Sequence, residues 1–562
     1  VSDNTLIDRI LTNISVTAEP IKNLFIKYNA GIDNTHQSRN TYMPKNTLYG
    51  SWTGGIASIN ERNTEQYLSE LTANYNFKPN TIHSFGLLTG YSYEKFKSNA
   101  NNSGNNNFIT DGFLWNNLNA GEGTKVVGSS ASENQLVSYF GRINYSLLDR
   151  YLFIATLRAD GASVFARNHK WGFFPSVALA WNMAEEKFMA SLKDKIPMLK
   201  WRVSYGKTGN SDIGENAFAA YYAAPAWSNY DNSPVIGVFP NRLENPDLKW
   251  ETTTELNLGL DVSMFNGYVS ASFEYYNKVI SDLLSMKALN SYHNISFVMA
   301  NIGKTQSRGF EFTLNTKNIT RKNLSWTTDF TFTTYKDRWL ERAVDWKPNV
   351  YESTIDPIRS IFARTTTGIL QIEDTKPQSQ PDLRPGQIII GDINGYVRDE
   401  NGNPAVNESG RFLLTGSPDG IIDEADTRLI GSLDPGFILG LTNSVKYKGF
   451  DFNFNFYGMF DRVMQNPTRM AYGLTSDGIA QYSYNALRSI KDRWMPNNPS
   501  TVNPSAYYGW STYGYGDYFY EKAWFVRLQN ISLGYTIPNN LISKIFSDAR
   551  IHFDVNNVFV IT

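Results

Sequence analysis

The sequence predicts an all-β protein, a transmembrane antiparallel β-barrel, and three observations carry this prediction. Apolar and polar residues alternate with a period of two along about 17 segments, as in strands whose two faces meet different surroundings. Many of these segments reach the ~9 to 11 residues that a tilted transmembrane strand needs, whereas soluble strands have a modal length of about five or six. Tight turns also alternate with long polar connections, which is the pattern of outer-membrane barrels.

The alternation of apolar and polar residues is clearest in a few segments. Between Phe450 and Phe456 every second residue is phenylalanine, and the residues between them are Asp or Asn. In chain order the clearest segments are 255–264, 269–273, 310–314, 324–334, 450–456 and 551–555. Between Lys336 and Gly431 the alternation weakens, so the number of strands is least constrained there. Short helices are expected at Met183–Leu192 and, from apolar residues at helical spacing, at Ile479–Trp494.

The connections between these segments alternate in length. Tight connections are expected at 77–81, 148–151, 264–268, 319–323 and 447–450, and long ones at 33–63, 98–133, 209–251, 278–306 and 461–519. Ser98–Asn107, which reads SNANNSGNNN, is expected to be a solvated loop. Soluble β-sandwiches and propellers also alternate apolar and polar positions. The length of the segments and the asymmetry of the connections favour the membrane barrel over them.

The composition excludes several classes of function. The chain has 562 residues, with 52 Lys and Arg against 53 Asp and Glu. It therefore lacks the basic excess by which proteins bind the phosphate backbone of nucleic acids. It has no cysteine, which excludes disulfides, thiol catalysis and Cys-ligated metal sites. No run approaches the ~18 consecutive apolar residues of a membrane-spanning helix.

No motif in the chain supports an enzymatic function. No two of the five histidines stand at the spacing of a HExxH zinc helix. The tripeptide GKT at Gly206–Thr208 and Gly303–Thr305 lacks the preceding glycine of a phosphate-binding loop. GxSxG and GxGxxG motifs are absent as well. We therefore expect no catalytic residues and no organic cofactor.

One group of polar residues has the residue types and spacing of a cation site. Oxygen-bearing side chains and turn glycines between Gly391 and Gly431 have spacings similar to those of a Ca²⁺ loop, although the insertion Tyr396–Pro418 divides them. The candidate ligands of a structural Ca²⁺ ion are Asp392, Asn394, Asp419, Asp423 and Asp426. A turn stabilised by Asx hydrogen bonds explains the same residues, and this alternative stays open.

Clusters of aromatic residues have two interpretations. Those at strand ends fit the girdles of a membrane barrel, where an amphipathic ring lies between headgroup and hydrocarbon. Those in the long connections are candidates for stacking on sugar rings or for contact with a partner protein. The candidate substrate-binding residues of this kind are Tyr507, Tyr508, Trp510 and Tyr518.

Several stretches carry a family resemblance and occur in the family's order. They are Asp160–Glu186, Asn245–Asp261, Gly431–Phe460, Trp524–Pro538 and Ile551–Thr562. In these stretches the chain resembles the β-barrel of the SusC/RagA family of TonB-dependent outer-membrane transporters of Bacteroidetes. The acidic region from Asp392 to Asp426 resembles a DxNGDGxIdxxD stretch of that family, and the insertion within it departs from the family pattern.

This resemblance implies a fold and a set of partners. The family has a 22-stranded barrel with an N-terminal plug, so residues 1–562 are expected to be one barrel domain, a fragment that lacks the plug and the final strand. The absence of a signal peptide before Ile10 and the apolar run at Val558–Thr562 agree with that expectation. The implied partners are a SusD-like surface lipoprotein, the TonB-ExbB-ExbD complex through a missing N-terminal segment, and outer-membrane lipid.

The function that the resemblance implies is import of a large nutrient across the cell outer membrane. An oligosaccharide is the expected substrate. Import of oligopeptides by a RagA-like protein is an alternative within the same class. A surface-binding or secretion-associated barrel that does not transport is an alternative from another class.

Overall fold

The computed structural model describes the chain except residues 215–216, 231–232, 291, 293–294, 296, 344–345, 354, 408–410, 474–484, 506–512 and 543–545. The chain forms two compact units. Unit 1 comprises 1–190, 200–258 and 278–304, and unit 2 comprises 191–199, 259–277 and 305–562.

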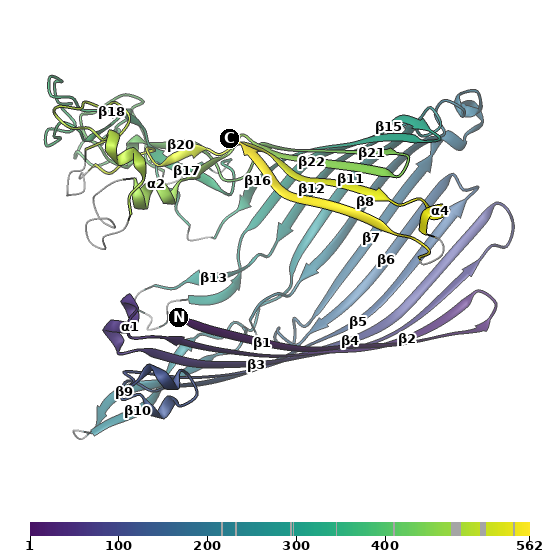
Figure 1. Ribbon diagram of the computed structural model, residues 1–562, viewed down its shortest axis with the longest axis horizontal. Coiled ribbons are helices and arrows are strands. Elements are labelled where there is room, and N and C mark those ends of the chain that lie inside the picture. Colours follow the sequence, from purple (N-terminus) through teal and green to yellow (C-terminus); the bar gives the residue numbers. More distant parts are fainter. Residues whose placement is uncertain are drawn as a thin grey trace. The chain divides into compact units, whose positions relative to one another are not determined.

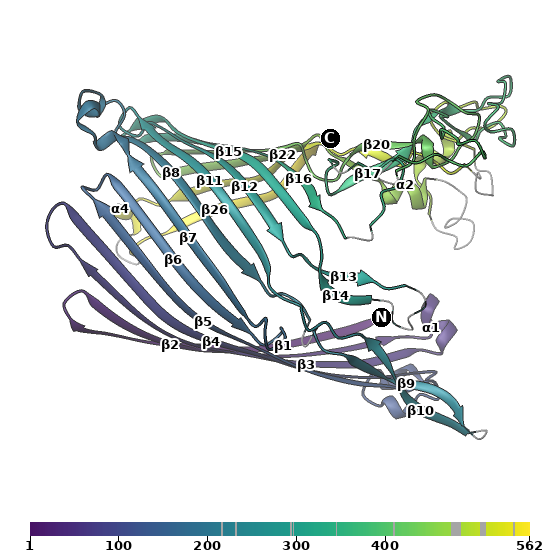
Figure 2. The same cartoon turned by 180° about the vertical axis from the view of Figure 1, so that it is seen from behind.

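Within the described residues, sixteen strands form one sheet in chain order, and neighbouring strands run antiparallel (Figures 1 and 2). The number is close to the predicted 17, and the all-β fold class is confirmed. The strands are β1 (Ser2–Ile21), β2 (Leu24–Met43), β3 (Ile56–Phe77), β4 (His83–Asn106), β5 (Val126–Leu147), β6 (Tyr151–Ala162), β7 (Trp171–Asn182), β8 (Met198–Asn210), β11 (Glu251–Met264), β12 (Val269–Ser281), β15 (Lys304–Arg321), β16 (Leu324–Glu341), β21 (Phe437–Tyr447), β22 (Phe450–Phe460), β25 (Phe525–Thr536) and β26 (Arg550–Ile561).

The predicted alternation of tight and long connections is confirmed in each unit. Tight turns join β3 to β4, β5 to β6, β15 to β16 and β21 to β22. Leu148 and Asp149, in the turn between β5 and β6, have φ of 56° and 55°, the left-handed geometry that suits the twist of a tight hairpin. In each unit the long connections leave the strands at the opposite end from these turns (Figure 1).

The prediction that Ser98–Asn107 is a loop was wrong. β4 runs through this stretch as far as Asn106 and pairs with both β3 and β5, as in Asn102↔Asn60 and Asn102↔Gly128. The backbone groups of β3 and β5 form hydrogen bonds with the backbone of these residues, whatever their side chains are. Where both faces of a strand meet water, no alternation is needed, so the strand leaves no pattern in the sequence. The 33–63 connection shrinks for the same reason, because β2 extends to Met43 and β3 starts at Ile56.

The remaining elements are short. At 183–192 the structure has two 3₁₀ helices, η3 (Met183–Glu185) and η4 (Lys187–Leu192), where a short helix was predicted. Of the second predicted helix, residues 479–484 lie outside the described part, and 488–492 form the 3₁₀ helix η6 (Arg488–Asp492). The other elements are α1 (Leu48–Thr53), η1 (Asp111–Phe113), η2 (Leu118–Ala120), β9 (Tyr221–Tyr230), β10 (Ser233–Arg242), β13 (Leu284–Ala288), β14 (Phe297–Asn301), β17 (Ser360–Arg364), β18 (Thr366–Ile369), β19 (Ile388–Ile390), η5 (Glu424–Asp426), β20 (Thr427–Ser432), β23 (Val463–Gln465), α2 (Pro467–Tyr472), β24 (Tyr520–Lys522) and α4 (Asn539–Ile542).

Buried apolar residues in unit 1 gather where long connections fold over strand ends. One cluster surrounds Trp250, whose ring contacts Phe165 and Phe174 with centroids 5.3 Å away in both cases. A smaller cluster joins Tyr42, Ala57 and Phe108. Among the described residues, no helix has the length and apolar character needed to cross a membrane.

Candidate functional site

The strands β3 to β8 of unit 1 present two chemically different faces. Their registers pair odd residues with odd residues throughout, so odd-numbered side chains share one face, here called the apolar face. Leu157, Phe173 and Val177 lie on it and expose 56%, 66% and 43% of their surface. Large apolar side chains so exposed over a continuous surface require an apolar environment. The even-numbered residues form the polar face, which carries side chains such as Arg158 and Asp160.

Two rows of aromatic rings border the apolar face of unit 1. Near the tight turns, Phe85 stacks on Phe77 and on Tyr145 with centroid distances of 4.9 and 4.8 Å. Nearer the long connections, Tyr139 lies 6.1 Å from Trp171. Aromatic rows on both sides of an apolar band are typical of a β-sheet that crosses a membrane.

Unit 2 has the same two-faced organisation. The phenylalanines of β22 lie on its apolar face, where Phe460 stacks on Phe437 of β21 at 4.7 Å. Asp451 and Asn455 alternate with them and lie on the polar face, where the Asn455 amide donates to the Thr442 hydroxyl at 2.6 Å.

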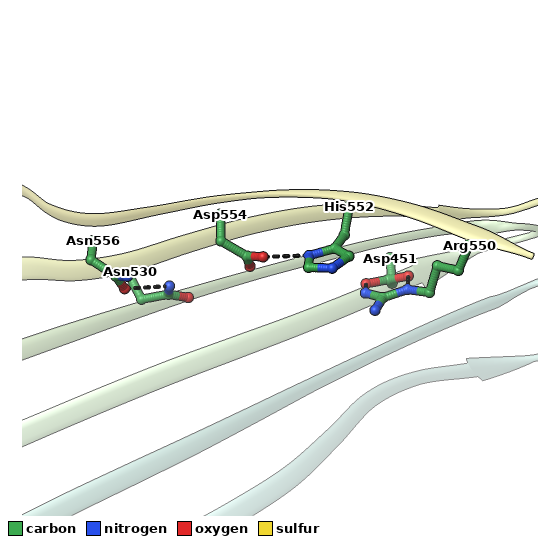
Figure 3. Close-up of polar contacts among 6 residues, drawn as sticks. All are labelled: Asp451, Asn530, Arg550, His552, Asp554 and Asn556. Atoms are coloured by element: carbon green, nitrogen blue, oxygen red, sulfur yellow. Dashed lines mark hydrogen bonds and ion pairs between the residues drawn. The ribbon is translucent and has the colours of Figure 1, made fainter. Parts of the chain in front are cut away.

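Charged and amide side chains of three strands pair on the polar face of unit 2 (Figure 3). Arg550 of β26 reaches over β25 to Asp451 of β22, with Nη2–Oδ2 and Nε–Oδ1 distances of 2.6 and 3.2 Å. Gly534 of β25 lies beneath this ion pair, and a Cβ there would stand 2.5 Å from Nη2. Further along, His552 contacts Asp554 and the Asn530 amide donates to Asn556 at 2.9 Å.

The polar face of unit 1 is hollowed by a cavity of 580 Å³ near its long connections. Gln66, Glu94, Asn134, Asp160 and Trp250 are among its lining residues. Arg158 is held at its edge, because its Nε donates to both oxygens of Asp160 at 2.7 and 2.8 Å and its Nη2 donates to Ser138 at 2.8 Å. A cavity with both donors and acceptors suits a polar, hydrogen-bonding solute.

At the turn end of unit 1, one carboxylate ties three elements together. Glu186, between η3 and η4, accepts hydrogen bonds from the Tyr151 hydroxyl at 2.6 Å and from the Trp181 indole at 3.1 Å. The Arg150 guanidinium is 3.4 Å away. The hydrogen bonds from Tyr151 and Trp181, followed by the charge of Arg150, hold the pKa of Glu186 below its ordinary value.

The two longest connections of unit 2, 342–436 and 461–524, pack together into what we call the loop assembly. Asp517 of the second connection accepts hydrogen bonds from the backbone N–H and the hydroxyl of Thr366 in the first. The Trp494 indole donates to Gln371 at 2.9 Å. Gln380 is fully buried, and its amide bonds both the N–H and the C=O of Ile390. Side-chain contacts therefore join the described parts of these two connections.

The structure brings the five predicted calcium ligands together in the loop assembly, although 24 residues separate Asn394 from Asp419. Their oxygens accept backbone N–H groups. Asp392 accepts from Gly420 at 2.8 Å, and Asp423 accepts from Ala425 at 2.8 Å in a capping box with Asp426. The remaining backbone N–H groups that these side chains accept are those of Asp419, by Asp392; Ile393, Asn394 and Asp423, by Asp426; Gly395 and Gly416, by Asn394; and Ile421, by Asp419.

This geometry is that of a turn closed by Asx hydrogen bonds, the alternative that the sequence left open. Gly395 permits the two halves to meet, because a Cβ there would lie 2.5 Å from the Cβ of Asp419. Within the described ranges, no group of three or more His, Cys, Asp or Glu side chains is arranged to hold a metal ion. The calcium site stays a prediction, with ligand oxygens that are already engaged.

Of the predicted substrate-binding aromatics, only Tyr518 belongs to the described part of the chain, since Tyr507, Tyr508 and Trp510 lie outside it. The Arg469 guanidinium lies 4.2 Å from the centroid of the Tyr518 ring, and the ring meets Phe519 edge to face at 5.0 Å. Arg469 also bonds Glu521 at 3.3 Å. One face of the Tyr518 ring is therefore already covered by a cation.

Sequence reasoning missed the charged pairs on the polar faces. Arg158 and Asp160 stand two apart in a strand, and Arg550 follows the same even-residue pattern as His552 and Asp554. The available signal was a charged residue on the polar side of an alternating strand. Which strand carries its partner depends on register, which the sequence does not display.

The comparison with known families decides the identity of the fold. Residues 7–365 match the family described as TonB dependent receptor-like, beta-barrel. The chain belongs to this family. The predicted resemblance is confirmed, and the family is one of transporters and receptors, not of enzymes.

Curated relatives extend the match over the whole chain. TonB-dependent receptor P3 of Formosa agariphila is 32% identical over 578 residues, which cover 100% of this chain and 54% of that protein. TonB-dependent receptor SusC of Bacteroides thetaiotaomicron is 30% identical over 449 residues, or 77% of this chain and 41% of SusC. The chain thus spans about half the length of the curated relatives it matches.

Among solved structures, the chain is similar to a chain of the RagAB peptide transporter. The TM-score is 0.80 at 21% sequence identity, and the match covers 100% of this chain and 59% of that one. At this identity the likeness establishes the fold. The chain therefore has the fold of a TonB-dependent receptor barrel.

Proposed function

We propose that this chain forms much of the wall of an outer-membrane, TonB-dependent importer of a large nutrient. The observation that carries the proposal is the pair of opposite faces in a chain of this family. An apolar face between aromatic rows suits lipid, and a polar face suits the solvated interior of a barrel. The short turns then lie on the periplasmic side and the loop assembly on the extracellular side.

An oligosaccharide is the proposed cargo. The polar faces offer amides, hydroxyls and paired charges, such as Asn455 with Thr442 and Arg158 with Asp160, that match the donors and acceptors of sugar hydroxyls. The loop aromatics supply rings for stacking. Oligopeptides are the second candidate, favoured by the likeness to a chain of the RagAB peptide transporter.

The proposed partners follow from the same class of transporter. A SusD-like lipoprotein would cover the extracellular mouth and contact the loop assembly, whose ordered packing offers it a defined surface. The TonB complex would supply energy through a segment that precedes this part of the protein. A structural Ca²⁺ ion in the acidic turn of the loop assembly is part of the proposal as well.

Purification of the full-length protein from outer membranes in mild detergent tests this function. We expect a surface lipoprotein to copurify with bound glycan, as identified by mass spectrometry, and deletion of the gene to abolish growth on that glycan. Bound peptide would choose the second candidate. Unchanged growth with loss of surface binding would support a non-transporting barrel and overturn the importer.

Loop aromatics can be tested separately. Trp510→Ala should weaken glycan binding without unfolding the barrel, because the stacking of an indole ring on a sugar ring is lost. Phe173→Ala, on the apolar face, is the control that should leave glycan binding unchanged. Equal glycan affinity in Trp510→Ala and the unchanged protein would sink the stacking proposal.

A further inference from the structure

A groove of 770 Å³ crosses the apolar face of unit 1 from β4 to β8. Small residues lie at its centre, namely Gly141 of β5, Ala155 of β6 and Pro175 of β7. A Cβ added at Gly141 would meet only the Leu88 carbonyl oxygen, at 3.7 Å, so the space around it is open. Larger apolar side chains border the groove: Leu87, Ile143, Leu157, Phe173, Val177 and Tyr205.

The aromatic rows indicate the level in the membrane at which this groove lies. Along β5, Gly141 and Ile143 lie between Tyr139 of one row and Tyr145 of the other. Along β7, Pro175 and Val177 lie between Trp171 and Trp181 in the same way. If the rows mark the two interfaces of the membrane, the groove lies at the level of hydrocarbon, where a soluble partner has no access.

A cation stands at one end of the groove. Lys207 of β8 alternates with Tyr205 and Val203 on the apolar face and lies three residues before the end of its strand. Within the part of the chain that the structure describes, Lys207 has no ion pair. A lysine on the lipid face is costly at the bilayer centre and much less costly near an interface. Lys207 follows Gly206, which pairs with Ser176, so it lies on the groove side of Trp171, and its long side chain can extend toward the outer interface to meet an anion.

We infer that this groove binds one acyl chain of an outer-leaflet lipid whose phosphate-bearing headgroup contacts Lys207. The apolar walls fit the chain, and the ammonium group complements the phosphate. The inference rests on the proposed outer-membrane location, and it adds a specific lipid site to it. A bound lipid would bridge β4 to β8 beneath the long connections.

The test uses the full-length protein purified from outer membranes in mild detergent. Phosphate-bearing lipid retained per protein is quantified by mass spectrometry, and folding is checked by heat-dependent migration on gels. Ala155→Leu fills the centre of the groove and should lower retained lipid about fivefold, since one to two methylene contacts are displaced. Lys207→Gln should lower it about fivefold at low salt and less at high salt.

Two matched controls separate the groove from general effects. Ala73→Leu makes the same exchange on the apolar face of β3, outside the groove, and Lys78→Gln removes a cation at the turn end. Both should retain lipid at the level of the unchanged protein. Leu157→Ala removes a side chain from the wall of the groove and should lose lipid as Ala155→Leu does. It replaces Ala155→Leu in the test if Ala155→Leu does not fold.

Retention by folded Ala155→Leu and Leu157→Ala at the unchanged level would overturn the inference, as would equal losses in Ala73→Leu. These results would leave the proposed importer intact. If the full-length protein fractionates away from the outer membrane, the proposed function fails first and the lipid site fails with it.

Discussion

In unit 2 the strand wall and the loop assembly are held together in different ways. The strands β21, β22, β25 and β26 are joined by long runs of backbone pairing, and most of their residues are half-buried or exposed. In its described residues the loop assembly has only strands of three to six residues, and buried polar side chains such as Gln380 and Asp426 hold it. The wall therefore distributes its stability over many equivalent bonds, whereas the loop assembly concentrates it in a few.

The first prediction tests, at Asp426, whether a few buried side chains hold the loop assembly. Its side chain is fully buried, and its two oxygens accept the N–H groups of Ile393, Asn394 and Asp423. Asp426→Ala leaves these donors unsatisfied and should destabilise the loop assembly by about 3 kcal/mol. Hydrogen exchange would detect faster exchange in 388–432 and unchanged exchange in β21 and β22.

Asp382 provides the control, because it is exposed in the same connection. Asp382→Ala should leave the hydrogen-exchange rates of 388–432 within about twofold of those in the original protein. If Asp426→Ala exchanges no faster than Asp382→Ala, the loop assembly is not held by its buried carboxylate, and the comparison with the wall fails.

The second prediction tests the wall at Gly534. Gly534→Ala places a methyl group against the Arg550–Asp451 ion pair, whose flexible guanidinium must move. Both side chains are partly exposed, so we expect a loss of only about 1 kcal/mol in the free energy of unfolding. Urea unfolding of the detergent-solubilised protein measures it.

Gly141→Ala is the matched control for Gly534→Ala, since nothing crowds its added methyl group, and it should be neutral within about 0.5 kcal/mol. If Gly534→Ala lost more free energy of unfolding than Asp426→Ala, the wall would also depend on single contacts. The predicted difference between the two regions would then be wrong.

The same difference explains what could be predicted from the sequence. Residues such as Phe450 to Phe456 reveal their strand because one face meets lipid and the other water, so period two is imposed by the environment. Ser98 to Asn107 carry polar or small side chains on both faces, so no such period exists to find. In the loop assembly the five acidic-turn residues could be named as a group, but their bonds to backbone N–H groups depend on a meeting of distant segments.

The third prediction concerns pH and the turn end of the wall in unit 1. Because hydrogen bonds from Tyr151 and Trp181 lower the pKa of Glu186 in the folded state, the ionised form contributes stability above the unfolded pKa. That contribution is lost as pH falls through the lowered pKa. Unfolding midpoints measured from about pH 6 down to about pH 3 should fall less steeply in Glu186→Gln than in the original protein.

Asp194→Asn is the control for Glu186→Gln, since it removes an exposed carboxylate from the same connection between β7 and β8. Its pH profile should keep the slope of the original. A Glu186→Gln profile that matches the original would show that the carboxylate does not couple the strands β6 and β7 to η3.

The smallest expected effect is that of calcium. It tests whether a bound ion adds to the side-chain hydrogen bonds that hold the loop assembly. The oxygens of Asp392, Asp419 and Asp423 accept backbone N–H groups, so a Ca²⁺ ion would have to compete with those bonds. We therefore expect a weakly bound ion, so that excess calcium slows hydrogen exchange in 392–426 by only about twofold relative to excess chelator. Stronger protection with calcium, abolished by Asp423→Asn, would instead establish a bound ion as a second source of order, because an ion stabilises the folded state that binds it in proportion to the logarithm of its concentration.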